Sequence, residues 1–163
     1  MAYVSGGSNL DAQQNLRLAA RTLKASYPGT RFSHCYRNAA IGFEGPDFIN
    51  FVAALPARGQ PCEMKVELER IELLCGRERS APKWAPRAMD LDLLLFGEQV
   101  LDEAGLKLPR PDLLRWAFML APLAEIAPQA RHPLAGRSIG ELWNDFDQHA
   151  HPLTREALDL NAA

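Results

Sequence analysis

The run Met89-Asp90-Leu91-Asp92-Leu93-Leu94-Leu95-Phe96 carries the clearest structural signal in the chain. Its nearly continuous apolar side chains predict a strand that is buried on one face or on both. The segment upstream predicts a helix from Pro61 to Gly76, because a proline at the first helical position loses no intrahelical hydrogen bond. The buried stripe of that helix is expected to consist of Met64, Leu68, Ile71 and Cys75. A polar loop joins this helix to the strand.

The N-terminal half predicts three further strands and one helix. Residues 2–7 predict a short strand, and apolar residues then recur at helical spacing from Ala12 to Leu23. Residues 32–36 and 48–53 predict two more strands. The resulting order of strand, helix, strand, strand, helix, strand predicts an α+β, ferredoxin-like βαββαβ sandwich. Residues 113–123 and a capping-box pattern that begins at Ser138 predict extra C-terminal helices.

Composition narrows the class of protein. The chain has 163 residues, of which 47% are hydrophobic and 23% charged, which suits a single domain over residues 1–163 with the tail after about residue 147 expected to be peripheral. The net charge of −2 argues against binding to nucleic acid or to an anionic membrane. The three cysteines form no CxxC pair, and no apolar run approaches the roughly 20 residues of a membrane span, so we expect a cytoplasmic protein.

Asp90 and Asp92 are the strongest candidates for chemistry. Residues two apart on a strand point to the same face, so their carboxylates are expected to lie side by side, where a divalent cation such as Mg²⁺ would offset their repulsion. Taken alone, this common Asp-x-Asp pattern favours a solvated strand end whose acidic side chains merely flank a turn. A loop rich in cations precedes the pair and favours a phosphate site instead. Its cations are Arg77, Arg79, Lys83 and Arg87.

Two other patterns are less specific. Phe48 and Asn50 would share one face of a strand, and an aromatic beside an amide suits a flat heteroaromatic ligand, with Phe118 a further aromatic candidate. Such residues more often fill a core or a sheet edge. The Gly6-Gly7-Ser8-Asn9 segment resembles a phosphate-binding turn only weakly and is better interpreted as a strand-to-helix turn. Asn9 and Asp11 are candidate caps for the helix that follows.

The chain resembles the hydroxymethyl-dihydropterin pyrophosphokinase family of folate biosynthesis. The resemblance is carried above all by Trp84-Ala85-Pro86-Arg87-Ala88-Met89-Asp90-Leu91-Asp92-Leu93-Leu94-Leu95-Phe96-Gly97. The supporting motifs fall in the family's order and extend the likeness to about Pro133; they are Gly7-Ser8-Asn9-Leu10, Arg70-Ile71-Glu72 with Gly76-Arg77, and Phe118-Met119-Leu120 followed by residues 122–128.

The resemblance implies a complete set of roles. Members of the family transfer the terminal diphosphate of ATP to the hydroxymethyl group of a reduced pterin and release AMP. The residues implied as catalytic are Arg77, Arg87, Asp90 and Asp92, of which Asp90 and Asp92 would hold two Mg²⁺ ions. Nucleotide binding is implied for Glu72, Arg79, Trp84, Arg87, Leu93 and Arg110. Pterin binding is implied for Phe48, Asn50, Phe118 and Asp90. The implied partners are ATP and the pterin alone, and we expect a monomer.

Some positions depart from the family's usual pattern. Arg110 stands where a histidine is usual, and Trp116 where an arginine is common. Residues 38–42 replace a loop that is usually richer in proline, and Gly105 and Lys107 also differ. These departures leave a second hypothesis open, a diverged paralogue that binds pterin or nucleotide with little or no turnover. A third, an RNA-binding ferredoxin-like module, is disfavoured by the slightly acidic net charge.

Overall fold

The computed structural model describes residues 1–78, 80, 86–103 and 105–162. Its strands are β1 (Ala2–Ser8), β2 (Arg31–Phe32), β3 (Cys35–Asn38), β4 (Phe48–Leu55), β5 (Asp90–Phe96), β6 (Leu101–Glu103), β7 (Leu106–Leu108), β8 (Arg131–His132), β9 (Arg137–Ser138) and β10 (Thr154–Glu156). Its α-helices are α1 (Ala12–Ser26), α2 (Pro61–Leu74), α3 (Ala117–Ile126) and α4 (Ile139–Asn144). Short 3-10 helices cover Pro111–Leu114 and Gln148–Ala150.

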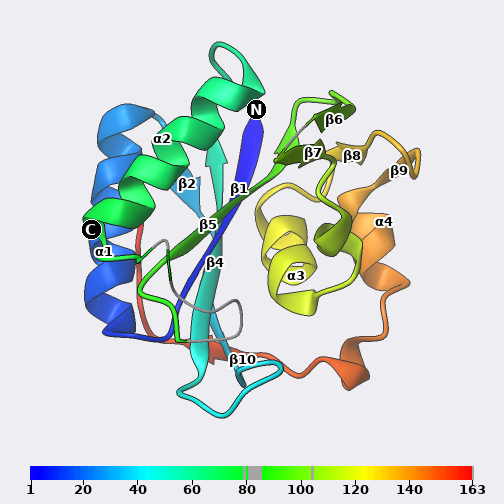
Figure 1. The fold of residues 1–163 in the computed structure, drawn as a ribbon. Helices are drawn as coiled ribbons and strands as arrows, with labels where there is room; N and C mark the ends of the chain where they lie inside the picture. The colour runs from blue at the N-terminus through cyan, green and yellow to red at the C-terminus, as the bar shows by residue number, and fades with distance from the viewer. Residues whose placement is uncertain (79, 81–85, 104, 163) are drawn as a thin grey trace.

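The main sheet is antiparallel and has the strand order β10-β3-β4-β1-β5, with β2 paired to β4. Strands β1, β3, β4 and β5 with helices α1 and α2 reproduce the predicted βαββαβ order, and the ferredoxin-like expectation is confirmed. Helices α1 and α2 cover one face of the sheet, whereas α3 and α4 lie on the other side (Figure 1). The protein is therefore layered as helices, sheet and helices, with an apolar core on each side of the sheet.

Strand β5 explains why one apolar run can serve both cores. Leu91 and Leu93 pack into the core under α1 and α2, so Asp90 and Asp92 face the other way. The pairing with β1 then shifts by one residue: Val4 lies opposite Leu93, whereas the preceding Tyr3 lies opposite Leu95. Leu94, at this irregularity, and Leu95, beyond it, pack into the core under α3. The predicted buried strand is confirmed.

The helical predictions are confirmed with local corrections. Helix α2 begins at Pro61 as expected, and Ser138 caps α4 by accepting a hydrogen bond from the Glu141 N–H at 3.2 Å. The helix expected over residues 113–123 is instead a 3-10 turn over Pro111–Leu114 followed by α3. At the start of α1, Asp11 occupies the N-cap position but its side chain makes no capping hydrogen bond. The Asn9 side chain does not cap α1 either, because it accepts a hydrogen bond from the Arg87 backbone N–H.

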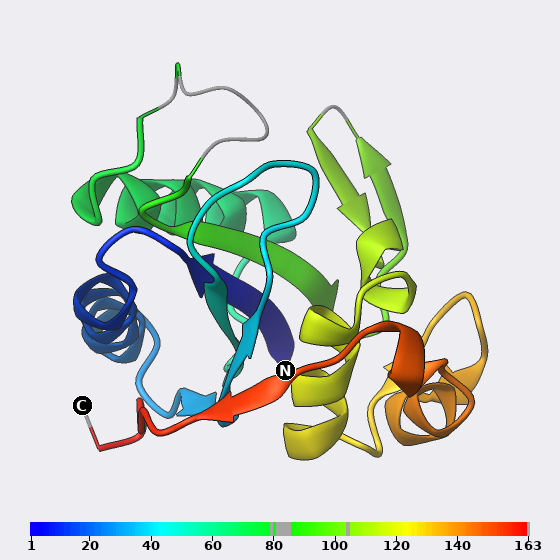
Figure 2. The same ribbon diagram turned by 90° about the horizontal axis from the view of Figure 1, so that it is seen from below.

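The C-terminal tail is less peripheral than its sequence indicated. Strand β10 pairs with β3 at the edge of the sheet, and the tail continues beside it (Figure 2). Leu158 and Leu160 are buried in the core under α1 and α2. The expectation missed this strand because Thr154, Arg155 and Glu156 are polar or charged, as suits a strand at the edge of a sheet.

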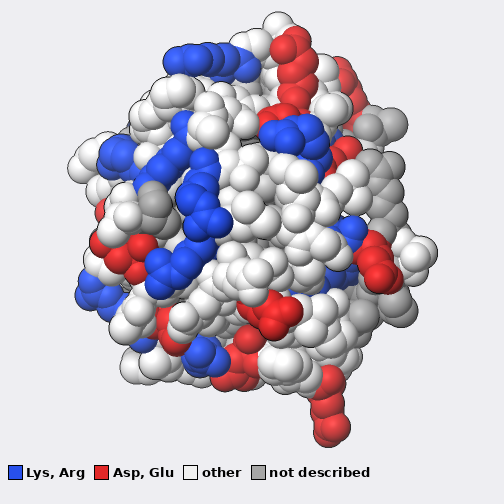
Figure 3. All heavy atoms as spheres, turned by 90° about the vertical axis from the view of Figure 1, so that its left-hand side faces the viewer, with Lys and Arg blue, Asp and Glu red and all other residues white. Residues whose placement is uncertain are grey.

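Basic side chains gather on the outer side of the helices that cover the first face (Figure 3). Arg17 and Arg21 are exposed residues of α1. Among the described residues, no helix is long and apolar enough to cross a membrane. Aromatic and acidic side chains of β4, β5 and α3 instead line a cavity on the opposite side of the sheet from this basic surface.

Candidate active site

A cavity of about 310 Å³ opens where β1, β4 and β5 meet the start of α3. Its floor consists of the small residues Ser5 and Gly7 of the central strand β1. Gly7 lies opposite Asp90 on one neighbouring strand and opposite Asn50 on the other. A Cβ at Gly7 would overlap the Asn50 amide oxygen. The cavity therefore exists because β1 carries almost no side-chain volume where its neighbours bring polar groups inward.

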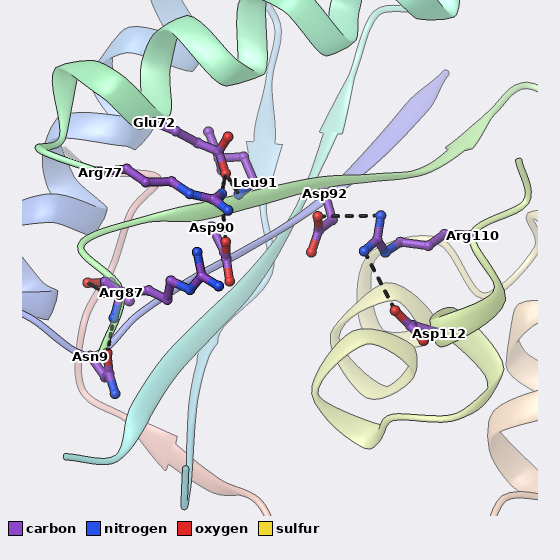
Figure 4. A network of polar contacts seen from close by, with 10 residues as sticks. Asn9, Glu72, Arg77, Arg87, Asp90, Leu91, Asp92, Arg110 and Asp112 are labelled. Atoms are coloured by element: carbon purple, nitrogen blue, oxygen red, sulfur yellow. Dashed lines mark hydrogen bonds and ion pairs between the residues drawn. The ribbon is translucent and has the colours of Figure 1, made fainter. Parts of the chain in front are cut away.

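Asp90 and Asp92 project to the same side of β5, as their spacing predicted, and both line the cavity (Figure 4). Arg77 approaches from the end of α2 and pairs with Asp90 at 2.7 Å. Arg110 approaches from the segment after β7 and pairs with Asp92 at 3.4 Å and with Asp112 at 3.6 Å. The side chain of Arg87 also extends towards Asp90 (Figure 4). The acidic pair is thus surrounded by arginines from three separate segments.

The acidic pair is chemically suited to a hard cation. Burial raises the pKa of the Asp92 carboxyl to about 6; the Arg110 guanidinium opposes this shift and the charge of Asp90 adds to it. A divalent cation would stabilise the ionised forms of both carboxylates. Within the described part of the chain, no group of three or more His, Cys, Asp or Glu side chains is arranged to hold a metal. A cation bound here would therefore complete its ligand set with water or with substrate oxygens.

Arg110 has unused hydrogen-bonding capacity. Its Nε atom is buried and has no hydrogen-bond partner among the described residues, while its terminal nitrogens face Asp92 and Asp112. A buried guanidinium N–H without an acceptor is costly, and an anionic oxygen within reach would offset that cost. Arg110 is therefore suited to an anionic ligand even though its carboxylate partners partly neutralise it.

Glu72, on α2, contacts both β5 and Arg77 and so supports the site. Its carboxylate accepts a hydrogen bond from the backbone N–H of Leu91 at 2.9 Å and also pairs with Arg77. Burial raises the pKa of Glu72 to about 7, although the Leu91 N–H and the Arg77 guanidinium both act to lower it. Glu72 therefore fixes β5 and Arg77 relative to α2, and so helps to orient the side chain that contacts Asp90.

The opposite wall of the cavity is aromatic. Phe48 and Phe43 meet edge to face with ring centroids 6.4 Å apart. Phe118 and Trp116 stack with centroids 6.1 Å apart and planes inclined by 15°. Asn50 lies between the polar and aromatic parts of the lining, is only 4% exposed, and donates a hydrogen bond to the Asn38 amide oxygen. Flat rings with an adjacent buried amide can hold and orient a planar heteroaromatic ligand.

The structure brings most of the predicted site residues together. The cavity is lined by Phe48, Asn50, Arg77, Arg87, Asp90, Asp92, Arg110 and Phe118. Glu72 and Leu93 instead line an adjoining cavity of about 200 Å³, which also touches Asp92 and Arg110. Arg79 and Trp84 lie outside the described residues.

Sequence reasoning did not single out the lining residues Ser5, Phe43 and Asp112, and it noted Asn38 and Ile41 only within the loop that departs from the family's usual pattern. Three of them belong to or adjoin the loop between β3 and β4, where no periodicity marks an inward side chain. Asp112 could have been noticed, because it follows Arg110 at a proline-flanked turn. Trp116 was noted only as a departure from a family pattern, and here it is part of the aromatic wall.

The fold and the cavity together define a ferredoxin-like α+β protein whose ligand site joins an acidic pair, several arginines and an aromatic wall. The family model for 7,8-dihydro-6-hydroxymethylpterin-pyrophosphokinase (HPPK) matches residues 3–128. The chain belongs to this family.

Relatives named 2-amino-4-hydroxy-6-hydroxymethyldihydropteridine pyrophosphokinase agree with this assignment. The chain is 42% identical over 144 residues to the one from Pseudomonas aeruginosa, which covers 86% of this chain and 88% of the relative. It is 38% identical over 149 residues to the one from a Synechocystis species, and this match covers 90% of this chain and 76% of the relative. It is 32% identical over 152 residues to the one from Haemophilus influenzae, and this match covers 91% of this chain and 94% of the relative.

Solved structures support the fold. The HPPK-DHPS protein of Plasmodium falciparum, solved with pteroate, matches with a TM-score of 0.65 at 12% sequence identity. The match covers 88% of this chain and 43% of that chain, so this chain spans less than half of the solved one. At this level of identity the likeness bears on the fold alone.

Proposed function

We propose that this protein transfers diphosphate from ATP to the hydroxymethyl group of 6-hydroxymethyl-7,8-dihydropterin, giving AMP and the pterin diphosphate, in folate biosynthesis. The observation that carries the proposal is that one cavity joins an acidic pair and arginines to an aromatic wall with a buried amide. The first half suits a polyphosphate and the second a flat heterocycle. Membership of the family and the names of the relatives support the same reaction. Nothing in these comparisons favours the alternative of a paralogue without turnover.

Asp90 and Asp92 would hold Mg²⁺, for which we propose two ions as the family resemblance implies. Bound there, Mg²⁺ would neutralise charge on the triphosphate and so make the transferred phosphorus more accessible to attack. Arg77 and Arg110 now pair with these two carboxylates. Their guanidinium groups would remain close enough to contact phosphate oxygens when the carboxylates turn to a cation.

Positioning is the main task of the remaining residues. Phosphoryl-type transfer depends more on alignment and charge neutralisation than on covalent chemistry. Phe48, Phe118 and Asn50 would orient the pterin so that its hydroxymethyl oxygen faces the phosphates. Arg87 would contact the transferred group, since its side chain extends into the same space as Asp90. Glu72, Arg79, Trp84 and Leu93 would complete the nucleotide side.

The direct test is release of AMP from ATP in the presence of Mg²⁺ and 6-hydroxymethyl-7,8-dihydropterin. We expect AMP formation to require the pterin and to stop when EDTA removes the divalent cations. AMP release that continues unchanged without the pterin would contradict the proposed reaction. AMP release unaffected by EDTA would contradict the metal assignment while leaving the diphosphate transfer standing.

A pair of matched variants localises the chemistry. Asp92→Asn keeps the size of the side chain but removes its charge, and we expect turnover to fall by orders of magnitude because cation binding is weakened. Asp102→Asn makes the same change on β6, where the side chain is 79% exposed and lies outside the cavity lining. We expect that control to retain wild-type turnover. Equal activity in the two variants would contradict the role of Asp92.

Gly7→Ala probes the pterin side. The added methyl group would displace the Asn50 amide, which a Cβ at this position overlaps. We expect the KM for the pterin to rise about tenfold, as for the loss of one well-placed hydrogen bond, with a smaller change in the KM for ATP. A variant with an unchanged KM for the pterin would argue against Asn50 as a pterin contact.

A further inference from the structure

The Gly7-Ser8-Asn9 motif contains a side chain whose contacts neither its expected capping role nor the proposed reaction explains. Asn9 is only 4% exposed, yet it lies just after β1 and not in either apolar core. We propose that Asn9 is a positioning residue that ties the segment carrying Arg87 to the loop carrying Ile41 and Phe43, and so aligns the two halves of the cavity. This inference rests on the proposed function for its kinetic consequences but not for its structural ones.

The first connection is to Arg87. The backbone N–H of Asn9 donates to the Arg87 carbonyl at 3.0 Å, and the backbone N–H of Arg87 donates to the Asn9 Oδ1 at 2.6 Å (Figure 4). The Ser8 hydroxyl adds a longer contact to the same carbonyl at 3.4 Å. Both polar groups of the Arg87 backbone are therefore held by the end of β1. This arrangement fixes where the Arg87 side chain leaves the backbone, three residues before the acidic pair begins.

The second connection is to the loop between β3 and β4. The Asn9 Nδ2 donates to the backbone carbonyl of Pro46 at 3.1 Å. This loop, residues 39–47, supplies Ile41 and Phe43 to the cavity lining, and Phe43 packs against Phe48. Figure 2 shows the loop at the same end of the sheet as the described part of the segment that leads into β5. One side chain thus joins two segments that are far apart in the sequence.

Only a primary amide of this length satisfies both partners at once. The Arg87 N–H requires an acceptor and the Pro46 carbonyl requires a donor, so the two partners fix the orientation of the amide. Aspartate would keep the acceptor but turn a second carboxylate oxygen towards the Pro46 carbonyl. Alanine would remove both contacts. The two variants therefore separate the Arg87 connection from the loop connection.

The kinetic test compares Asn9→Asp and Asn9→Ala in the AMP-release assay, with Asn15→Ala as the control. Asn15 also makes a side-chain-to-backbone hydrogen bond, to Leu10 at 2.7 Å, but lies outside the cavity lining. We expect Asn9→Asp to raise the KM for the pterin by about tenfold, because the buried Asn9 side chain loses its hydrogen bond to the Pro46 carbonyl, while kcat changes less than threefold. We expect Asn9→Ala to lower kcat by at least about tenfold as well, because Arg87 also loses its anchor. Asn15→Ala should resemble the wild type in both constants.

A second readout does not depend on activity. Hydrogen exchange at the Arg87 amide should accelerate at least tenfold in Asn9→Ala and remain slow in Asn9→Asp, which keeps the acceptor. Exchange in residues 39–47 should accelerate in both variants. If the wild type releases no AMP, the proposed reaction fails but this exchange pattern still decides the positioning role. An Arg87 amide that exchanges at the wild-type rate in Asn9→Ala would overturn the inference. So would an Asn9→Asp variant in which the KM for the pterin and the KM for ATP rise equally.

Discussion

Replacing Asp92 with asparagine should make the metal-free protein more stable while it removes activity. Asp92 lies beside Asp90 in a partly buried position, where 29% of its side chain is exposed. Burial raises the pKa of this carboxyl from 3.8 to about 6, with Arg110 opposing the shift and Asp90 adding to it. The folded protein therefore holds this proton more tightly than the unfolded chain does.

The sign of the pH dependence follows from that difference. Between about pH 4 and pH 6, the unfolded chain has released the proton and the folded protein still retains it, so the free energy of unfolding falls as pH rises through this window. The higher pKa in the folded protein corresponds to a loss of about 3 kcal/mol in the free energy of unfolding across this window. This is an upper value, because water reaches part of the side chain. Asparagine cannot ionise and is free of this penalty. The variant's advantage should be near zero at pH 4 and reach its full value above pH 6.

Urea denaturation of both proteins at pH 4 and pH 8, with EDTA present, measures this advantage. Asp102→Asn is the control, because its exposed carboxylate pairs with Lys107 only at 3.9 Å and should change the free energy of unfolding by no more than about 1 kcal/mol. Mg²⁺ added at pH 8 should stabilise the wild type more than Asp92→Asn. An advantage equal at both pH values, or a variant less stable than the wild type at pH 8, would contradict a raised pKa of Asp92 in the folded protein.

Three further substitutions test the fold and the cavity wall. Gly6→Ala should lower the free energy of unfolding by about 1–3 kcal/mol in urea denaturation, because an added Cβ would overlap the Phe51 ring; an unchanged midpoint would contradict this. Leu160→Ala should cost about 2–5 kcal/mol, since this tail residue is fully buried, and a loss below 1 kcal/mol would show that the tail is not part of the core. Trp116→Leu removes the stack on Phe118 and should weaken pterin binding about threefold to tenfold by calorimetry, whereas unchanged affinity would exclude Trp116 from the site wall.

The parts of the fold that follow from local patterns were predictable. The stretch from Asp90 to Phe96 and the helix that begins at Pro61 are specified by their own residues, through hydrophobic runs and proline geometry. Strand β10 was not predictable in this way. Its residues are polar or charged, and it exists because β3 offers a free edge and the following Leu158 and Leu160 find room in the core. Such a strand depends on its partner more than on its own sequence.

The same distinction divides the candidate site. The acidic pair was predictable because strand periodicity alone sets Asp90 and Asp92 on one face. The role of Asn9 was not, because a short polar residue before a helix is far more often a cap, and only the folded chain brings Arg87 and Pro46 to either side of its amide. Local spacing therefore identifies groups that act together on one element. Groups that join separate loops become recognisable only when both of their partners are placed, and such residues determine how the two halves of a cavity are aligned.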